Sequence, residues 1–128
     1  MKLLKITPEG EFSIVETTRE NFLNTCHREI GCTTIEMPCC MGLPDHYRLI
    51  VDESGLLKED PVLNPLPWYW YSRWHPQAPI VGTVLVCRVA RVGKYKELDA
   101  VSLTEEDLQF FKEWETSAAA AYARAVLR

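Results

Sequence analysis

An apolar run from Ile80 to Cys87 is the sequence feature that most constrains how this chain folds. Aliphatic residues, most of them β-branched, fill the run apart from Gly82, Thr83 and Cys87. A short run of this kind, without polar alternation, is typical of a strand that lies inside a sheet. We therefore predict that it forms the centre of a β-sheet.

Four shorter segments predict the remaining strands. Residues 3–6 and 12–15 flank the turn Thr7-Pro8-Glu9-Gly10, and this arrangement predicts a hairpin. Residues 33–37 and 47–52 are rich in β-branched and aliphatic side chains, and we expect these two segments to pair across a loop. With the apolar run, the sheet has about five strands and is mainly antiparallel.

Two amphipathic segments predict helices that pack on this sheet. The first covers residues 19–29 and ends before Gly31, a residue suited to a left-handed helix stop. The second covers residues 104–127, where Thr104 and Asp107 resemble a capping box and apolar residues recur every three or four positions. Between strands and helices, the five prolines of residues 60–79 predict a structured loop or short helical turns.

The chain length and composition predict a single α+β domain that spans residues 1–128. A chain of 128 residues is long enough for one hydrophobic core and too short for two ordinary domains. No run of about 18 apolar residues is present, and Met1 to Lys5 lack the apolar stretch of a signal peptide. We therefore expect a cytoplasmic protein that does not associate with membranes. The net charge of −4 argues against bulk nucleic-acid binding.

The cysteines predict neither a disulfide framework nor a metal site. Their number, five, is odd, and a cytosolic chain keeps its thiols reduced. Six potential zinc ligands lie within 21 residues: Cys26, His27, Cys32, Cys39, Cys40 and His46. Their spacing lacks the Cys-x(2–4)-Cys pairs of structural zinc sites. We expect no cofactor, and we interpret Cys26, Cys32 and Cys87 as small core residues, with zinc binding as the alternative.

Three short motifs follow one another in a specific order. They are Val51-Asp52-Glu53-Ser54-Gly55, Leu63-Asn64-Pro65 and Ile80-Val81-Gly82. Over roughly residues 1–108, this order resembles a family of small bacterial proteins of unknown function, carried largely by phages and other mobile elements, with a VDE-x-G, LN-x, IVG pattern. The resemblance implies a phage accessory protein that acts in the bacterial host cytoplasm. It marks Asn64 and Gly82 as hallmark residues and implies no reaction.

The most unusual segment runs from Pro67 to His75 and holds three of the four tryptophans and two of the five tyrosines. Such rings stack on bases or anchor protein interfaces, and Arg73 adds a charge for phosphate or carboxylate. The alternative is a hydrophobic lid over the sheet. Farther along, residues 88–96 contain four bases and no acid, which predicts either an anion-binding surface or a solvated strand end.

We expect the aromatic loop to fold back along the central strand, so that aromatic and basic groups converge on one ligand. The predicted ligand-binding residues are Asn64, Trp68, Trp70, Arg73, Trp74, Arg88, Arg91, Lys94 and Lys96. The first hypothesis is a non-enzymatic counter-defence protein that sequesters a small nucleotide-like ligand. The second is a protein inhibitor of a host factor, acting through the same surface or through the acidic residues 104–115.

A third hypothesis is a small hydrolase. Cys39 or Cys40 with His46 or His75 would supply its nucleophile and base, but no catalytic motif surrounds them, and we predict no catalytic residues. We also predict a homodimer through the alanine-rich face of residues 118–125, unless that face covers the chain's own sheet.

Overall fold

Strand β5 (Val84–Val92) is the centre of the sheet in the computed structural model, which describes residues 1–127. It pairs with β1 (Lys2–Ile6), β4 (Tyr47–Asp52) and β6 (Glu97–Val101), and all of these pairings are antiparallel. Strand β2 (Phe12–Glu16) extends the sheet beyond β1, and β3 (Ile35–Glu36) extends it beyond β4. The predicted α+β fold with a mainly antiparallel sheet is therefore confirmed.

The central strand differs from its prediction at both ends. It begins at Val84 because Gly82 has a φ of +73°, a left-handed conformation that interrupts extended pairing. Val81 instead forms an isolated bridge with Leu63. At its other end the strand continues to Val92, and a turn leads into β6, a sixth strand that was not predicted from the sequence.

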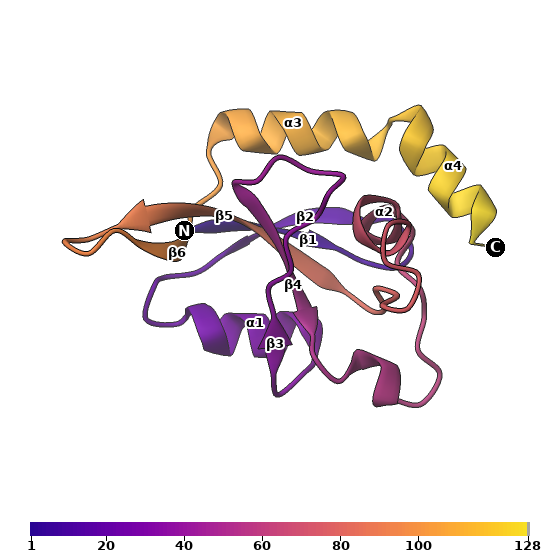
Figure 1. The fold of residues 1–128 in the computed structure, drawn as a ribbon, viewed down its shortest axis with the longest axis horizontal. Helices are drawn as coiled ribbons and strands as arrows, with labels where there is room; N and C mark the ends of the chain where they lie inside the picture. The colour runs from indigo at the N-terminus through magenta and orange to yellow at the C-terminus, as the bar shows by residue number, and fades with distance from the viewer. Residues whose placement is uncertain (128) are drawn as a thin grey trace.

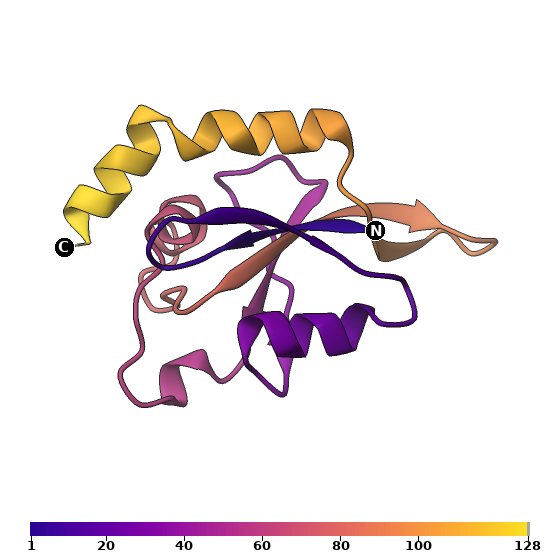
Figure 2. The same ribbon diagram turned by 180° about the vertical axis from the view of Figure 1, so that it is seen from behind.

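Helices cover both faces of the sheet (Figure 1). Helix α1 (Phe22–Ile30) lies on one face and ends at Gly31, whose φ of +77° is the predicted left-handed stop. Helix α3 (Glu105–Glu115) lies on the other face, together with the aromatic segment (Figure 2). Buried side chains of β1, β4 and β5 alternate between these two faces, so the core has one apolar cluster on each side of the sheet.

The predicted terminal helix over residues 104–127 is in fact two helices, and the single-helix prediction is wrong. The capping box of Thr104 and Asp107 starts α3 as expected. Helix α4 (Ala118–Val126) follows after Ser117, whose extended backbone turns the chain and whose Oγ accepts a bond from the Ala120 N–H. The turn lets α4 bury Ala120 and Ala123 against the chain itself.

The proline-rich segment forms short helical turns, as predicted. A turn η1 (Gly55–Leu57) follows β4, and α2 (Pro65–Pro67) continues into η2 (Trp68–Ser72), one turn of π-helix. Gly42 allows this turn to pack closely, because a Cβ at that position would lie 2.7 Å from the Trp70 Cα. Helix α4 packs against both α2 and η2.

Candidate functional site

Asn64 fixes the start of the aromatic segment. It is fully buried, and its Nδ2 donates to the carbonyls of Ile6, at 3.0 Å, and Gly82, at 2.9 Å. Its backbone N–H donates to the carbonyl of Ile80. Asn64 therefore ties the segment to β1 and to the entrance of β5, and this predicted ligand residue lies inside the protein scaffold.

The turn after β4 packs beside the same strand entrance. The Asp52 carboxylate accepts a bond from the Ser54 N–H and lies 2.7 Å from the Lys58 Nζ. Gly55 is buried there, and it packs so closely that a Cβ at this position would lie 2.9 Å from the Val81 side chain. The three motifs that carry the family resemblance therefore meet in space, where they hold the framework of the aromatic segment.

Trp70 is the part of the aromatic segment that fills the core. It is fully buried, and its ring makes edge contacts with Phe111 and Trp114, each at 5.7 Å between ring centroids. Trp68 is half-buried. The lid interpretation therefore describes Trp70, which joins the segment to α3.

Arg73 and Trp74 face solvent and form the exposed part of the same segment. The Arg73 guanidinium lies 3.9 Å from the Tyr69 ring centroid and 5.0 Å from that of Trp74. Tyr69 contacts Tyr122 of α4 edge-on, at 6.3 Å. Trp74 and Tyr122 are 50% and 54% exposed. We call this group of four, Tyr69, Arg73, Trp74 and Tyr122, the aromatic–arginine surface.

The guanidinium of this surface is available to a partner. Within residues 1–127, Arg73 forms no ion pair and its side chain donates no hydrogen bond. A stacked guanidinium keeps its edge N–H groups free, and these match a carboxylate or a phosphate. Tyr69 and Tyr122 were not among the site residues predicted from the sequence. Tyr122 joins the surface only because the turn at Ser117 brings α4 back to the aromatic segment.

Arg88, by contrast, is occupied inside the protein. Its Nη1 lies 2.7 Å from the Asp107 Oδ1, and Asp107 also accepts bonds from the Tyr47 hydroxyl at 2.5 Å and the Thr104 N–H at 2.8 Å. Burial by itself raises the pKa of the Asp107 carboxyl, but these donors outweigh burial and hold it below its usual value. Burial and the Asp107 hydrogen bond raise the pKa of Tyr47, which keeps its hydroxyl protonated as a donor.

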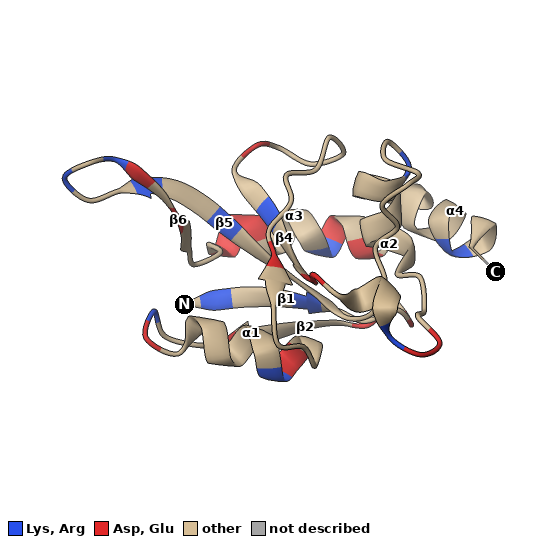
Figure 3. Ribbon diagram, turned by 60° about the horizontal axis from the view of Figure 1, so that its bottom comes forward, with Lys and Arg blue, Asp and Glu red and all other residues tan. Residues whose placement is uncertain are grey.

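The rest of the basic run lies far from the aromatic segment. Arg91 is exposed on β5, and Lys94 and Lys96 are exposed in the β5–β6 hairpin, which projects from one end of the molecule, whereas α2 lies at the other (Figures 1 and 3). The expected convergence of aromatic and basic groups is therefore wrong. The physical reason is strand length, because nine extended residues span roughly 30 Å and the aromatic loop does not fold back along them.

The cysteines differ in burial, and burial makes two of them poor nucleophiles. Burial raises the pKa of Cys40, and that of Cys87, to about 12, so both stay protonated at neutral pH. Cys39 is exposed. In the described part of the chain, no cluster of three or more His, Cys, Asp or Glu side chains has the arrangement of a metal site. No helix there has the length and apolar character needed to span a membrane.

A family model described as "Domain of unknown function (DUF3846)" matches residues 1–115. The chain belongs to the DUF3846 family. The match ends at the last residue of α3, so α4 and its Tyr122 lie beyond the part of this DUF3846 protein that the family model covers. Comparisons with curated proteins and with solved structures found no match.

Proposed function

We propose that this protein is a non-enzymatic binding protein that inhibits a host protein. In this proposal an acidic segment of the host protein binds to the aromatic–arginine surface. The proposal rests on the Arg73 guanidinium, which has no acidic partner within residues 1–127, is stacked on Tyr69 and lies next to the half-exposed Trp74. Tryptophan, tyrosine and arginine dominate the binding energy of protein interfaces. A carboxylate of the host segment would pair with the Arg73 guanidinium, and apolar residues next to it in that segment would cover the Trp74 indole.

The shape of the surface favours a protein partner over a small molecule. Small ligands are held in concave pockets that bury most of their surface. Trp74 is instead half-exposed, as is Tyr122 of the neighbouring helix. An open surface of this kind gives a small molecule few contacts and gives a protein segment many.

A nucleotide-like ligand is the second candidate function. It is supported by the 5.0 Å separation of the Arg73 guanidinium from the Trp74 ring, because an indole stacks on a base while a guanidinium binds phosphate. In that case the bound and sequestered partner would be a nucleotide, and no host protein would need to bind.

The biological setting that we propose rests on the motif resemblance. The order of Asp52-Glu53, Asn64 and Gly82 resembles proteins carried by phages and other mobile elements. We propose that the protein works in the cytoplasm of a bacterial host as an accessory factor against host defence. Either a blocked host protein or a sequestered nucleotide signal fits that role.

The proposal is tested by comparing three forms of the purified protein in capture from bacterial lysate. They are the wild type, the double variant Arg73→Ala/Trp74→Ala, and the control Lys94→Ala/Tyr95→Ala. The control removes a similar pair at the far hairpin, where the Lys94 Nζ lies 5.6 Å from the exposed Tyr95 ring.

Mass spectrometry then identifies both captured proteins and small molecules released on denaturation. A protein retained by the wild type and the control, and lost by the Arg73→Ala/Trp74→Ala variant, supports the host-protein proposal. Stoichiometric nucleotide that follows the same pattern supports the second candidate instead. Equal capture by all three forms contradicts both.

A further inference from the structure

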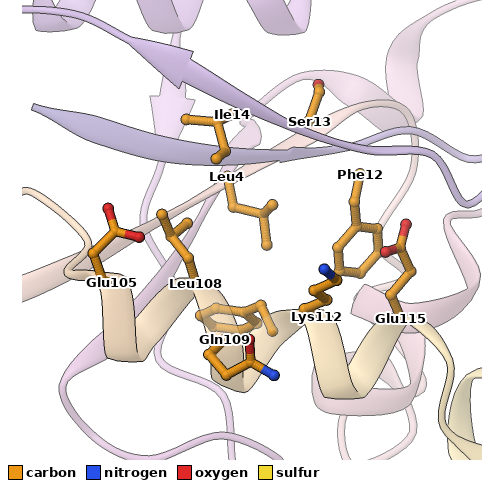
Figure 4. Close-up of a pocket in the computed structure, with 10 residues that line it drawn as sticks. Leu4, Phe12, Ser13, Ile14, Glu105, Leu108, Gln109, Lys112 and Glu115 are labelled. Carbon is orange, nitrogen blue, oxygen red and sulfur yellow. The ribbon is translucent and has the colours of Figure 1, made fainter.

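A groove of about 320 Å³ lies between the β1–β2 hairpin and α3 (Figure 4), and Trp74 is not among the residues that line it. Its floor is apolar and includes Leu4, Phe12 and Leu108. Charged side chains of α3, among them Glu105 and Lys112, stand at its rim. An apolar floor with a charged rim is the composition of a specific contact surface.

The groove opens beside strand β2, which is one edge of the sheet. Bonds from Thr7 to Glu11, at 3.1 Å, and from Thr17 to Met1, at 2.9 Å, bracket the β1–β2 ladder. Because hydrogen-bonded pairs alternate along antiparallel strands, Ile14 and every second residue of β2 turn their N–H and C=O groups away from β1. These groups are a template for a further strand.

Ile14 marks the place where a further strand would add. Its side chain lines the groove, yet it is 53% exposed, so an apolar residue stands in solvent directly beside unpaired ladder groups. Monomeric proteins protect such edges with charged residues, prolines, bulges or a covering element, and none of these stands at Ile14 itself. Ser13, which precedes it, also lines the groove, but its side chain points to the opposite face of β2 (Figure 4).

We propose that β2 pairs with β2 of a second copy of this chain, giving a twofold-symmetric dimer with one continuous sheet. The twofold axis passes midway between the two Ile14 residues, which exchange N–H to C=O bonds, and their side chains meet beside the two grooves. Self-pairing of one edge is the isologous arrangement that closes a dimer. This interface is separate from the aromatic–arginine surface and does not depend on the proposed function.

The charges on α3 favour a second copy as the occupant. Glu105 and Lys112 are seven residues apart, which is two helical turns, so both lie on the groove side of α3. A twofold axis normal to the sheet is perpendicular to α3, so the α3 helices of the two copies are antiparallel. Glu105 of each copy then faces Lys112 of the other, while Glu105 gives up only an exposed contact with Lys2.

Light scattering at micromolar concentration tests the pairing. The wild type should have twice the chain mass of 14.7 kDa. Ile14→Pro should be monomeric with an unchanged circular dichroism spectrum, because the lost N–H points away from β1. Ile14→Lys should also be monomeric, whereas the control Ser13→Lys, on the opposite face, should remain dimeric.

A charge exchange tests the α3 contact. Lys112→Glu should raise the dimer dissociation constant by roughly tenfold, through repulsion from Glu105, and the double variant Glu105→Lys/Lys112→Glu should restore it. A monomeric wild type, or folded Ile14 variants that stay dimeric, would overturn the proposal. If Lys112→Glu has no effect, the antiparallel arrangement of α3 is wrong.

Discussion

Asp107→Asn should destabilise the protein far more than any other removal of an acid in the first turn of α3. Asp107 is 3% exposed and binds three donors at once: the Tyr47 hydroxyl, the Arg88 guanidinium and the Thr104 N–H. These donors come from β4, β5 and the start of α3 respectively. The carboxylate therefore joins the helix to the two central strands.

The cost of the substitution follows from these contacts. Asparagine keeps the shape but is neutral, and its NH₂ group must face a donor that previously faced an oxygen. Hydrogen bonds to a charged group contribute about 1.5–3 kcal/mol each, and a lost helix cap costs about 1 kcal/mol. Arg88 is 34% exposed in its side chain, so water compensates part of its loss. We expect a decrease of roughly 2–4 kcal/mol in the free energy of unfolding at neutral pH.

This decrease should depend on pH in a defined direction. The folded protein holds the pKa of Asp107 below its usual value. A depressed carboxylate contributes stability that is fully present above its unfolded pKa, about 3.9, and is lost as the pH falls through the folded value. The difference between wild type and Asp107→Asn should therefore shrink in acid.

Urea unfolding followed by circular dichroism, at neutral pH and at about pH 3, measures both effects. Glu106→Gln is the matched control, because Glu106 is an exposed acid in the same helical turn, and it should cost less than about 0.5 kcal/mol. Equal losses for Asp107→Asn and Glu106→Gln, or a difference that does not depend on pH, would refute the reasoning.

Three further outcomes follow from the packing of the core. Trp70→Ala should lower the free energy of unfolding, measured in urea, by about 3–5 kcal/mol, because the ring is fully buried against α3. A decrease below about 1 kcal/mol would contradict the burial of this ring. Gly42→Ala should lower the melting temperature, since the added Cβ meets the Trp70 backbone, and an unchanged melting temperature would contradict that contact. Iodoacetamide at pH 8 should label exposed Cys39 before Cys40 and Cys87, and mass spectrometry showing equal rates would contradict the raised pKa values.

Features with a local physical signal were predictable from the sequence. Gly31 ends α1 in the left-handed conformation, and Thr104 with Asp107 forms the capping box of α3, because both depend on neighbouring residues alone. The break at Ser117 also had a local signal, a good cap residue before an alanine run. The helical spacing of apolar residues across the break concealed it.

The candidate site depended on distances that no local pattern records. The aromatic segment precedes β5 and the basic run occupies its far end, but β5 is long enough to keep them apart. Tyr69 and Tyr122 are distant in sequence and meet because α4 turns back at Ser117. Asn64 was predicted from its motif as a binding residue, and the structure shows the backbone carbonyls that its amide holds.

The most direct test of the proposed binding surface is a titration of the captured host protein into variants at Arg73 and Trp74, measured by isothermal calorimetry. Trp74→Ala should weaken binding by about 2 kcal/mol, roughly 30-fold in Kd. Arg73→Lys should weaken it by roughly tenfold, because lysine keeps the charge but loses the planar stack on Tyr69. If both variants bind the host protein with wild-type affinity, the proposed binding surface is wrong. A loss of affinity in the control Lys94→Ala/Tyr95→Ala would instead place the binding site at the β5–β6 hairpin.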